Sequence, residues 1–282
     1  MVGFVNNLKT VGLLAALFAL LVFVGGAVAG QQGLIIAGVI ATLMNVGAWF
    51  FSDTIAIKSM QGREVDPNSP GGRDLYEMVD RLSKRAGIPT PRVYVCPHEA
   101  PNAFATGRSP NKAAVAFTQG LLRLLDREEL EGVAAHELAH IKNRDTLTST
   151  IAATVAGIFS MLAQWFFFFG GGLRREGVNP LLALGMVLLG ALGAVLIKAM
   201  ISRSREFVAD ADGAAIAGSP DGLASALRKL ESMARRVPLQ QPNPAMNNLF
   251  IVEPFMGRGL TELFASHPPT EKRVAALLGR RR

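Results

Sequence analysis

The chain has 282 residues, of which 50% are hydrophobic, with a mean hydropathy of +0.29 and a formal net charge of +7. This hydropathy is unusual for a soluble domain and indicates segments that cross a membrane. The cations do not form a basic stripe interleaved with aromatic residues, so we expect no binding of nucleic acid. The single cysteine, Cys96, excludes an intramolecular disulfide and a cysteine-rich metal site, which fits a reducing compartment.

Four apolar segments are long enough to cross a bilayer: residues 11–29, 34–51, 147–169 and 181–200. Only a few residues separate the first two segments, which predicts an uncleaved helical hairpin at the N-terminus. A signal peptide cleaved after Ala27-Val28-Ala29 is the alternative for the first segment. A buried core helix is the alternative for each of the four.

The positive charges predict the orientation of these segments. Of the 29 Lys and Arg residues, only Arg174 and Arg175 fall in the predicted outer loops. We therefore expect an α-helical membrane protein with four transmembrane helices, whose polar regions face the cytoplasm. The predicted division is a hairpin at 1–51, a first cytoplasmic part at 52–146, a second hairpin at 147–200 and a second cytoplasmic part at 201–282.

The polar region after the first hairpin predicts a small α+β unit. Residues 66–72 are rich in Pro and Gly and are interpreted as a linker. An apolar stripe with helical spacing follows over residues 73–85. Alternating or short apolar runs bounded by turn residues then predict strands at 92–96, 102–106 and 113–118.

The sequence His-Glu-Leu-Ala-His at residues 136–140 predicts a metal site on a helix. Asp126 is a good N-cap for that helix, and acidic residues follow in its first turn. Histidines at i and i+4 project from one helix face and can bind one Zn²⁺, with Glu137 as general base for an attacking water. The alternative is a surface helix on which two histidines have this spacing by chance.

A catalytic zinc needs a third protein ligand. Glu206 and Asp210 have i, i+4 spacing on a probable helix, so Glu206 can bind zinc while Asp210 accepts a hydrogen bond from a ligand histidine. A solvated acidic helix face is the alternative. Two apolar segments separate His140 from Glu206, so the chain returns to the side of the membrane that it left and these residues can meet.

The remaining C-terminal region predicts one clear helix. Ser219-Pro220-Asp221 is a strong helix start, and the helix is expected to run to about Arg236. Residues 238–259 are rich in Pro, Asn and Gln and are interpreted as a loop. This loop is either an ordinary linker or a lid over the site.

Four motifs together resemble one known family. They are His-Glu-Leu-Ala-His-Ile-Lys-Asn-Arg-Asp at 136–145, Ser-Arg-Ser-Arg-Glu-Phe-Val-Ala-Asp at 202–210, Ser-His-Pro-Pro at 266–269 and Asn-Ala-Phe-Ala-Thr-Gly at 102–107. In their order, and in the hydropathy of nearly the whole chain, they resemble the HtpX-type membrane zinc metalloproteases, which are relatives of the CAAX prenyl proteases. The resemblance implies a zincin-like protease domain on the cytoplasmic side of a bacterial inner membrane.

The resemblance also implies a set of site residues. One Zn²⁺ per chain would be bound by His136, His140 and Glu206. Glu137 would be the catalytic base, and Asp210 would support a ligand histidine.

Three further residues have roles only through the resemblance. Asn102 would hold the substrate backbone at an edge strand, and His267 and Arg273 would face the substrate carbonyl or the tetrahedral oxyanion. Read from their local sequence, they are a loop amide, a turn residue before two prolines and a solvated cation, respectively.

The expected function is hydrolysis of peptide bonds in damaged or misfolded membrane proteins, as part of protein quality control and the stress response. The expected partners are these protein substrates and the lipid bilayer, with other membrane quality-control proteases as candidates. The alternatives are a processing protease of the CAAX prenyl type, a non-catalytic membrane scaffold with structural zinc, and a transporter with a zinc-dependent gate.

Overall fold

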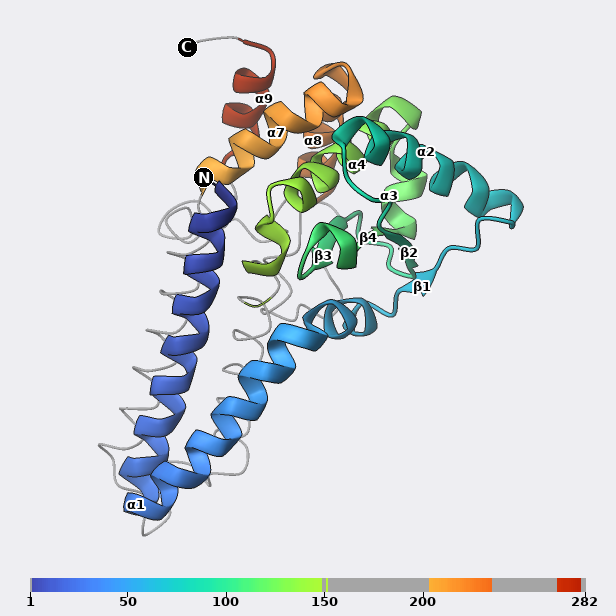
Figure 1. The fold of residues 1–282 in the computed structure, drawn as a ribbon. Coiled ribbons are helices and arrows are strands. Elements are labelled where there is room, and N and C mark those ends of the chain that lie inside the picture. The colour runs from blue at the N-terminus through green and yellow to red at the C-terminus, as the bar shows by residue number, and fades with distance from the viewer. Residues whose placement is uncertain (1, 149–150, 152–202, 235–267, 280–282) are drawn as a thin grey trace.

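The computed structural model describes residues 2–148, 151, 203–234 and 268–279 (Figure 1). The segments predicted at 147–169 and 181–200, and the loop at 238–259, lie almost wholly outside these residues. The described elements are α1 (Val2–Ser59), β1 (Arg63–Glu64), α2 (Pro70–Ala86), β2 (Arg92–Cys96), β3 (Ala103–Gly107), the 3-10 turn η1 (Pro110–Lys112), β4 (Ala113–Thr118), α3 (Gln119–Leu124), α4 (Arg127–Lys142), α7 (Arg203–Ala217), α8 (Asp221–Ala234) and α9 (Thr270–Leu277).

The first element, α1, is folded back on itself as a hairpin of two helical arms (Figure 1). The chain reverses near Gly30, whose φ of +57° is a conformation that glycine adopts readily. The arms touch closely, because a Cβ placed on Gly25 would lie 2.3 Å from the Cβ of Ala37. The Asn45 side chain also donates a hydrogen bond to the Leu14 carbonyl, at 2.9 Å.

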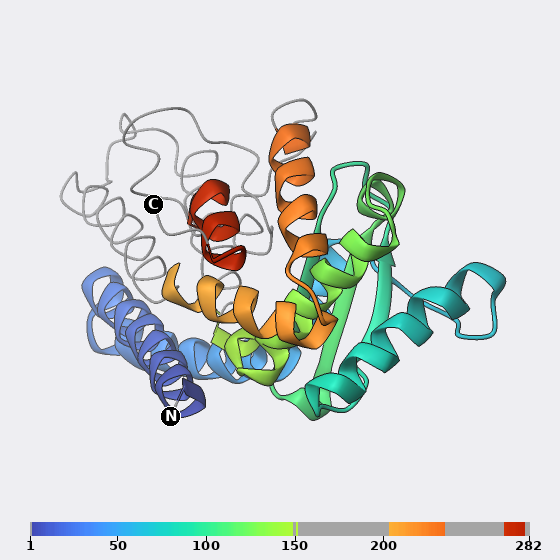
Figure 2. The ribbon, with the colours of Figure 1, turned by 90° about the horizontal axis from the view of Figure 1, so that it is seen from above.

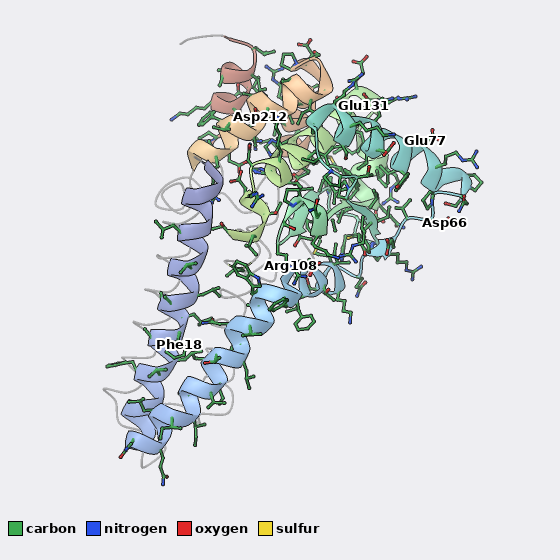
Figure 3. The ribbon with its side chains drawn as sticks, in the orientation of Figure 1. Phe18, Asp66, Glu77, Arg108, Glu131 and Asp212 are labelled. Carbon is green, nitrogen blue, oxygen red and sulfur yellow. The ribbon has the colours of Figure 1, made fainter. Side chains whose placement is uncertain are left out.

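The outside of this hairpin is apolar. Figure 3 shows side chains such as Phe18 on α1, away from the α+β domain. Within the described residues, one stretch, Gly30–Phe51, is long and apolar enough to cross a membrane, with 22 residues and a mean hydropathy of 2.0. Leu14–Phe23 is a shorter apolar stretch in the first arm. Four transmembrane helices are therefore not established by the described part of the chain.

The four strands form one mixed sheet in the order β1-β2-β4-β3. β2 pairs parallel to β4, while β3 pairs antiparallel to β4 and β1 antiparallel to β2. The three predicted strands are thus confirmed, and the two-residue β1 is an addition. β3 lies at the edge of this sheet.

The two faces of the sheet are covered by different elements, as the view from above makes clear (Figure 2). Val93, Val115 and Phe117 face α2, α4 and the C-terminal helices in the main core. The intervening residues, such as Phe104 and Ala116, face the end of α1 in a second, smaller cluster. Period-two alternation along β2, β3 and β4 thus directs alternate side chains to the end of α1 on one face and to the helical layer on the other.

Helix α2 begins earlier than the sequence pattern predicts. Residues 70–72 were expected to belong to a linker, but they form the first turn of the helix. Ser69 is the N-cap and its Oγ accepts a hydrogen bond from the Gly72 N–H, at 3.2 Å. Proline is well suited to the first helical position, because its missing N–H has no intrahelical partner there.

Helix α4 begins with the predicted cap and is tied to α8. Asp126 and Glu129 form a capping box. Glu129 is buried at 3% exposure and also accepts hydrogen bonds from Ser225 and Lys229 of α8, each at 2.6 Å. Nearly every residue from Gly132 to Ile141 is buried, so α4 is the central helix of the domain.

We predict that Glu129→Ala lowers the free energy of unfolding by roughly 2 kcal/mol, because it removes half of the capping box and the acceptor of two cross-helix hydrogen bonds. Denaturant-induced unfolding in mixed micelles, followed by circular dichroism, measures this change. Glu128→Ala is the matched control, since Glu128 is exposed on the same turn. Equal losses in the two variants would contradict the buried link.

Candidate metal centre

The two histidines of α4 converge on one point. His136 Nε2 and His140 Nε2 are 3.1 Å apart, and the two rings are nearly perpendicular at 84°. His136 is buried at 1% exposure, while the His140 side chain keeps 15%. The one-turn spacing along α4 therefore brings two nitrogen ligands together, as the sequence predicts.

The third group comes from α7, which packs against α4. Glu206, buried at 5%, has one carboxylate oxygen 3.7 Å from His136 Nε2 and the other 3.6 Å from His140 Nε2. The two helices come this close because Gly213 has no side chain. A Cβ at Gly213 would lie 2.9 Å from the Cα of His136.

These three side chains fit a zinc ion. Zinc bonds of about 2.0–2.1 Å at tetrahedral angles place neighbouring ligand atoms roughly 3.3 Å apart. The two ring nitrogens are 3.1 Å apart, and each lies 3.6 or 3.7 Å from a different oxygen of the Glu206 carboxylate, which is close to that value. His136, His140 and Glu206 are also the group of described residues whose ligand atoms all lie within 4.8 Å of one another.

The charges around the ligands also suit a divalent cation. The buried ionisable groups of the described residues near the ligand atoms are four carboxylates and two guanidinium groups, which leave two negative charges when both histidines are neutral. They are Glu137, Asp145, Glu206, Asp210, Arg205 and Arg273. A divalent ion balances this excess.

Asp210 lies next to the His136 ring. The Nδ1 of that ring lies 3.0 Å from Asp210 Oδ1, which leaves Nε2 for the metal. Asp210 in turn binds Arg273 through two hydrogen bonds of 2.8 and 2.6 Å. Burial alone would raise the pKa of Asp210, but the hydrogen bonds from Arg273 and His136 lower it to about 2.

Arg273 lies inside the site and is not a solvated cation. It is 1% exposed, although its local sequence suggested a surface side chain. Its Nη1 lies 3.6 Å from Glu206 Oε2 and its Nη2 lies 3.4 Å from His136 Nε2. The guanidinium therefore borders two of the three metal ligands. His267, three residues before α9, lies outside the described residues.

Glu137 and Asn102 are both buried, at 5% and 1% exposure. The charge of Glu137 acts on His140, whose pKa it helps to raise.

Asn102 directly precedes β3, and its backbone exchanges hydrogen bonds with Thr118 at the end of β4. All five residues of β3 are buried as well.

One carboxylate of the site was not predicted from the sequence. Asp145 Oδ2 lies 3.1 Å from His140 Nδ1, and Arg205 lies beside Asp145. Burial opposes protonation of His140, but the hydrogen bond to Asp145 and the charges of Glu206 and Glu137 raise its pKa to about 9. The sequence did contain one indication of this residue, because Asp145 is the last residue of the motif at 136–145.

We predict that Gly213→Ala weakens zinc binding at least tenfold, because the added Cβ pushes α7 and Glu206 away from the histidines. Overpacking of this kind costs about 1–3 kcal/mol. Competition with a chromophoric chelator measures the affinity. Gly71→Ala is the matched control, since a Cβ there meets nothing within 4 Å. Unchanged zinc affinity in Gly213→Ala would show that the helix crossing does not set the ligand geometry.

Known proteins resemble this chain over most of its length. The model of the Peptidase family M48 matches residues 72–281. Proteins described as "Protease HtpX homolog" are 48% identical in Desulfatibacillum aliphaticivorans (98% of this chain, 90% of the relative) and 50% identical in Nostoc punctiforme (97% and 96%).

A solved structure, the crystal structure of S. mikatae Ste24p, has a similar fold, with a TM-score of 0.50 at 17% identity. The alignment covers 93% of this chain, which spans only 62% of the Ste24p chain. The resemblance to HtpX-type proteases inferred from the four motifs is confirmed. The chain belongs to peptidase family M48.

Proposed function

We propose that this membrane-associated metalloprotease is a zinc endopeptidase that cleaves damaged or misfolded membrane proteins. The observation that carries the proposal is the convergence of two imidazoles and one carboxylate within 3.1–3.7 Å, beside the buried carboxylate of Glu137. Three protein ligands leave the fourth position of a tetrahedral site open, as catalytic zinc requires. A structural zinc more often has four protein ligands, so a scaffold role is disfavoured.

The chemistry is divided between the metal and the protein. Zinc, when bound, polarises the scissile carbonyl and acidifies the attacking water. Glu137 takes the proton from that water and delivers it to the leaving amide nitrogen. Arg273 is fixed by Asp210 beside the ligands, where its charge favours the negative oxygen of the tetrahedral intermediate. His267, which precedes Pro268 and α9, is the second candidate for that role.

The substrate is proposed to bind as an extended strand along β3, with Asn102 holding its backbone. β3 pairs with β4 on one side, and no partner strand is found on its other side within the described residues. Recognition through backbone hydrogen bonds makes few demands on sequence. Broad selectivity of this kind suits a protease that removes damaged proteins rather than one that processes a single tail.

The placement in the membrane is a further part of the proposal. The α1 hairpin and the apolar segments at 147–169 and 181–200 would form four transmembrane helices. Residues 52–146 and 201–282 would form one protease domain on the cytoplasmic side of the bacterial inner membrane. The guanidinium of Arg108 lies 4.9 Å from the centre of the Phe50 ring, where α1 meets the domain (Figure 3), and an arginine beside an aromatic ring at this point supports a membrane surface there.

We predict that Glu137→Gln keeps its zinc but loses cleavage of an unfolded model protein by 10²–10⁴-fold, about the contribution of general base catalysis. The enzyme is solubilised in detergent, stripped with a chelator and then given zinc. Cleavage is followed on gels and bound zinc by atomic absorption. Glu128→Gln, exposed on the same helix, is the control and should cleave normally. Undiminished cleavage by Glu137→Gln would remove the hydrolytic assignment.

We predict that a cysteine replacing Arg174 reacts with a membrane-impermeant maleimide in intact cells, because the orientation places Arg174 outside. A cysteine replacing Asn68, exposed before α2, should react only after lysis. The native Cys96 gives little background, since it is buried and burial raises the pKa of its thiol to about 11. The reverse labelling pattern would overturn the cytoplasmic placement.

A further inference from the structure

His140 has a carboxylate partner of its own, separate from the one that holds His136. His140 Nδ1 lies 3.1 Å from Asp145 Oδ2, and the Asp145 side chain is 4% exposed. A hydrogen bond at Nδ1 fixes the tautomer whose Nε2 carries the lone pair, and it stops rotation of the ring. Each of the two histidines therefore has a carboxylate close to its Nδ1 atom, Asp145 for His140 and Asp210 for His136.

Asp145 reaches this position because the chain turns sharply after α4. Residues five apart on a regular helix do not share a face, so a straight continuation of α4 would point Asp145 elsewhere. Arg144 adopts a left-handed conformation with φ of +59° and reverses the chain. Asn143 donates a hydrogen bond of 2.8 Å to Asp212 of α7, which anchors the turn.

A buried carboxylate requires a compensating charge. Arg205 provides it, since its Nη1 lies 3.6 Å from Asp145 Oδ1 and its side chain is 10% exposed. Arg205 directly precedes Glu206, so the same turn of α7 carries a metal ligand and the partner of Asp145. The Asp145–Arg205 ion pair thus joins the His140 end of α4 to the Glu206 end of α7.

We propose that Asp145 and Arg205 are positioning residues of the metal centre, which hold His140 and Glu206 in the geometry that binds zinc. Asp145 orients the His140 ring, and Arg205 holds Asp145 while fixing the register of α7 against α4. The inference rests on the proposed zinc site but not on the peptidase reaction.

The test is the rate at which the full-length, detergent-solubilised protein releases zinc to an excess of chromophoric chelator. Asp145→Asn is expected to release zinc 10–100-fold faster, because removing a partner of a ligand histidine usually weakens metal binding by that factor. Arg205→Gln should also release zinc faster, and Arg205→Lys should recover part of the loss because it keeps the charge. The double variant Asp145→Asn/Arg205→Gln should resemble Asp145→Asn alone, since the two residues act through one contact.

A second readout separates positioning from general loss of stability. The visible absorption bands of bound Co²⁺ report ligand geometry, and they should shift in Asp145→Asn at temperatures well below unfolding. Asp80→Asn, which breaks a surface ion pair with Lys84, is the matched control and should change neither readout. Wild-type release rates and spectra in both Asp145→Asn and Arg205→Gln would overturn the inference while leaving the zinc site intact. A wild-type protein that binds no zinc would overturn the proposed function and this inference together.

Discussion

The crossing of α4 and α7 is the constraint on which the rest of the domain depends. It brings ligands from two distant parts of the chain within 3.7 Å of one another, and it requires Gly213 at the point of contact. The charged side chains around the ligands are deeply buried, so each of them needs an opposite charge nearby. Arg273 from α9 and Arg205 from α7 meet part of that need, which explains why α9 packs beside the site.

The sheet supports the crossing of α4 and α7, because one of its faces packs against α4. Small residues such as Ala103 and Ala105 of β3 let α4 lie close over the sheet, while the larger Phe117 fills the core beside it. The opposite face carries Phe104 and Tyr94 against the end of α1. The sheet therefore lies between the end of α1 and the helix that carries His136 and His140, and it packs against both.

The local parts of the fold were readable in the sequence, because each depends on neighbouring residues. Examples are the helix cap at Asp126, the i, i+4 spacing of His136 and His140, the same spacing of Glu206 and Asp210, and the alternation along β2. The burial of Arg273 and the position of Asp145 beside His140 could not be predicted from the sequence. Both depend on contacts between distant segments, and Asp145 also depends on a left-handed turn at Arg144 that arginine seldom adopts. The start of α2 was missed because Pro-Gly-Gly is typical of a linker, although proline is also favoured at the first helical position.

The order of the ligands along the chain has a consequence for biosynthesis. A ribosome completes His136 and His140 well before it reaches Glu206, and Arg273 follows only near the end. Because the apolar residues between His140 and Glu206 must be translated first, the nascent chain cannot form the three-ligand centre until they have been made. The order of translation thus places completion of the candidate metal centre after synthesis of the apolar segments between His140 and Glu206.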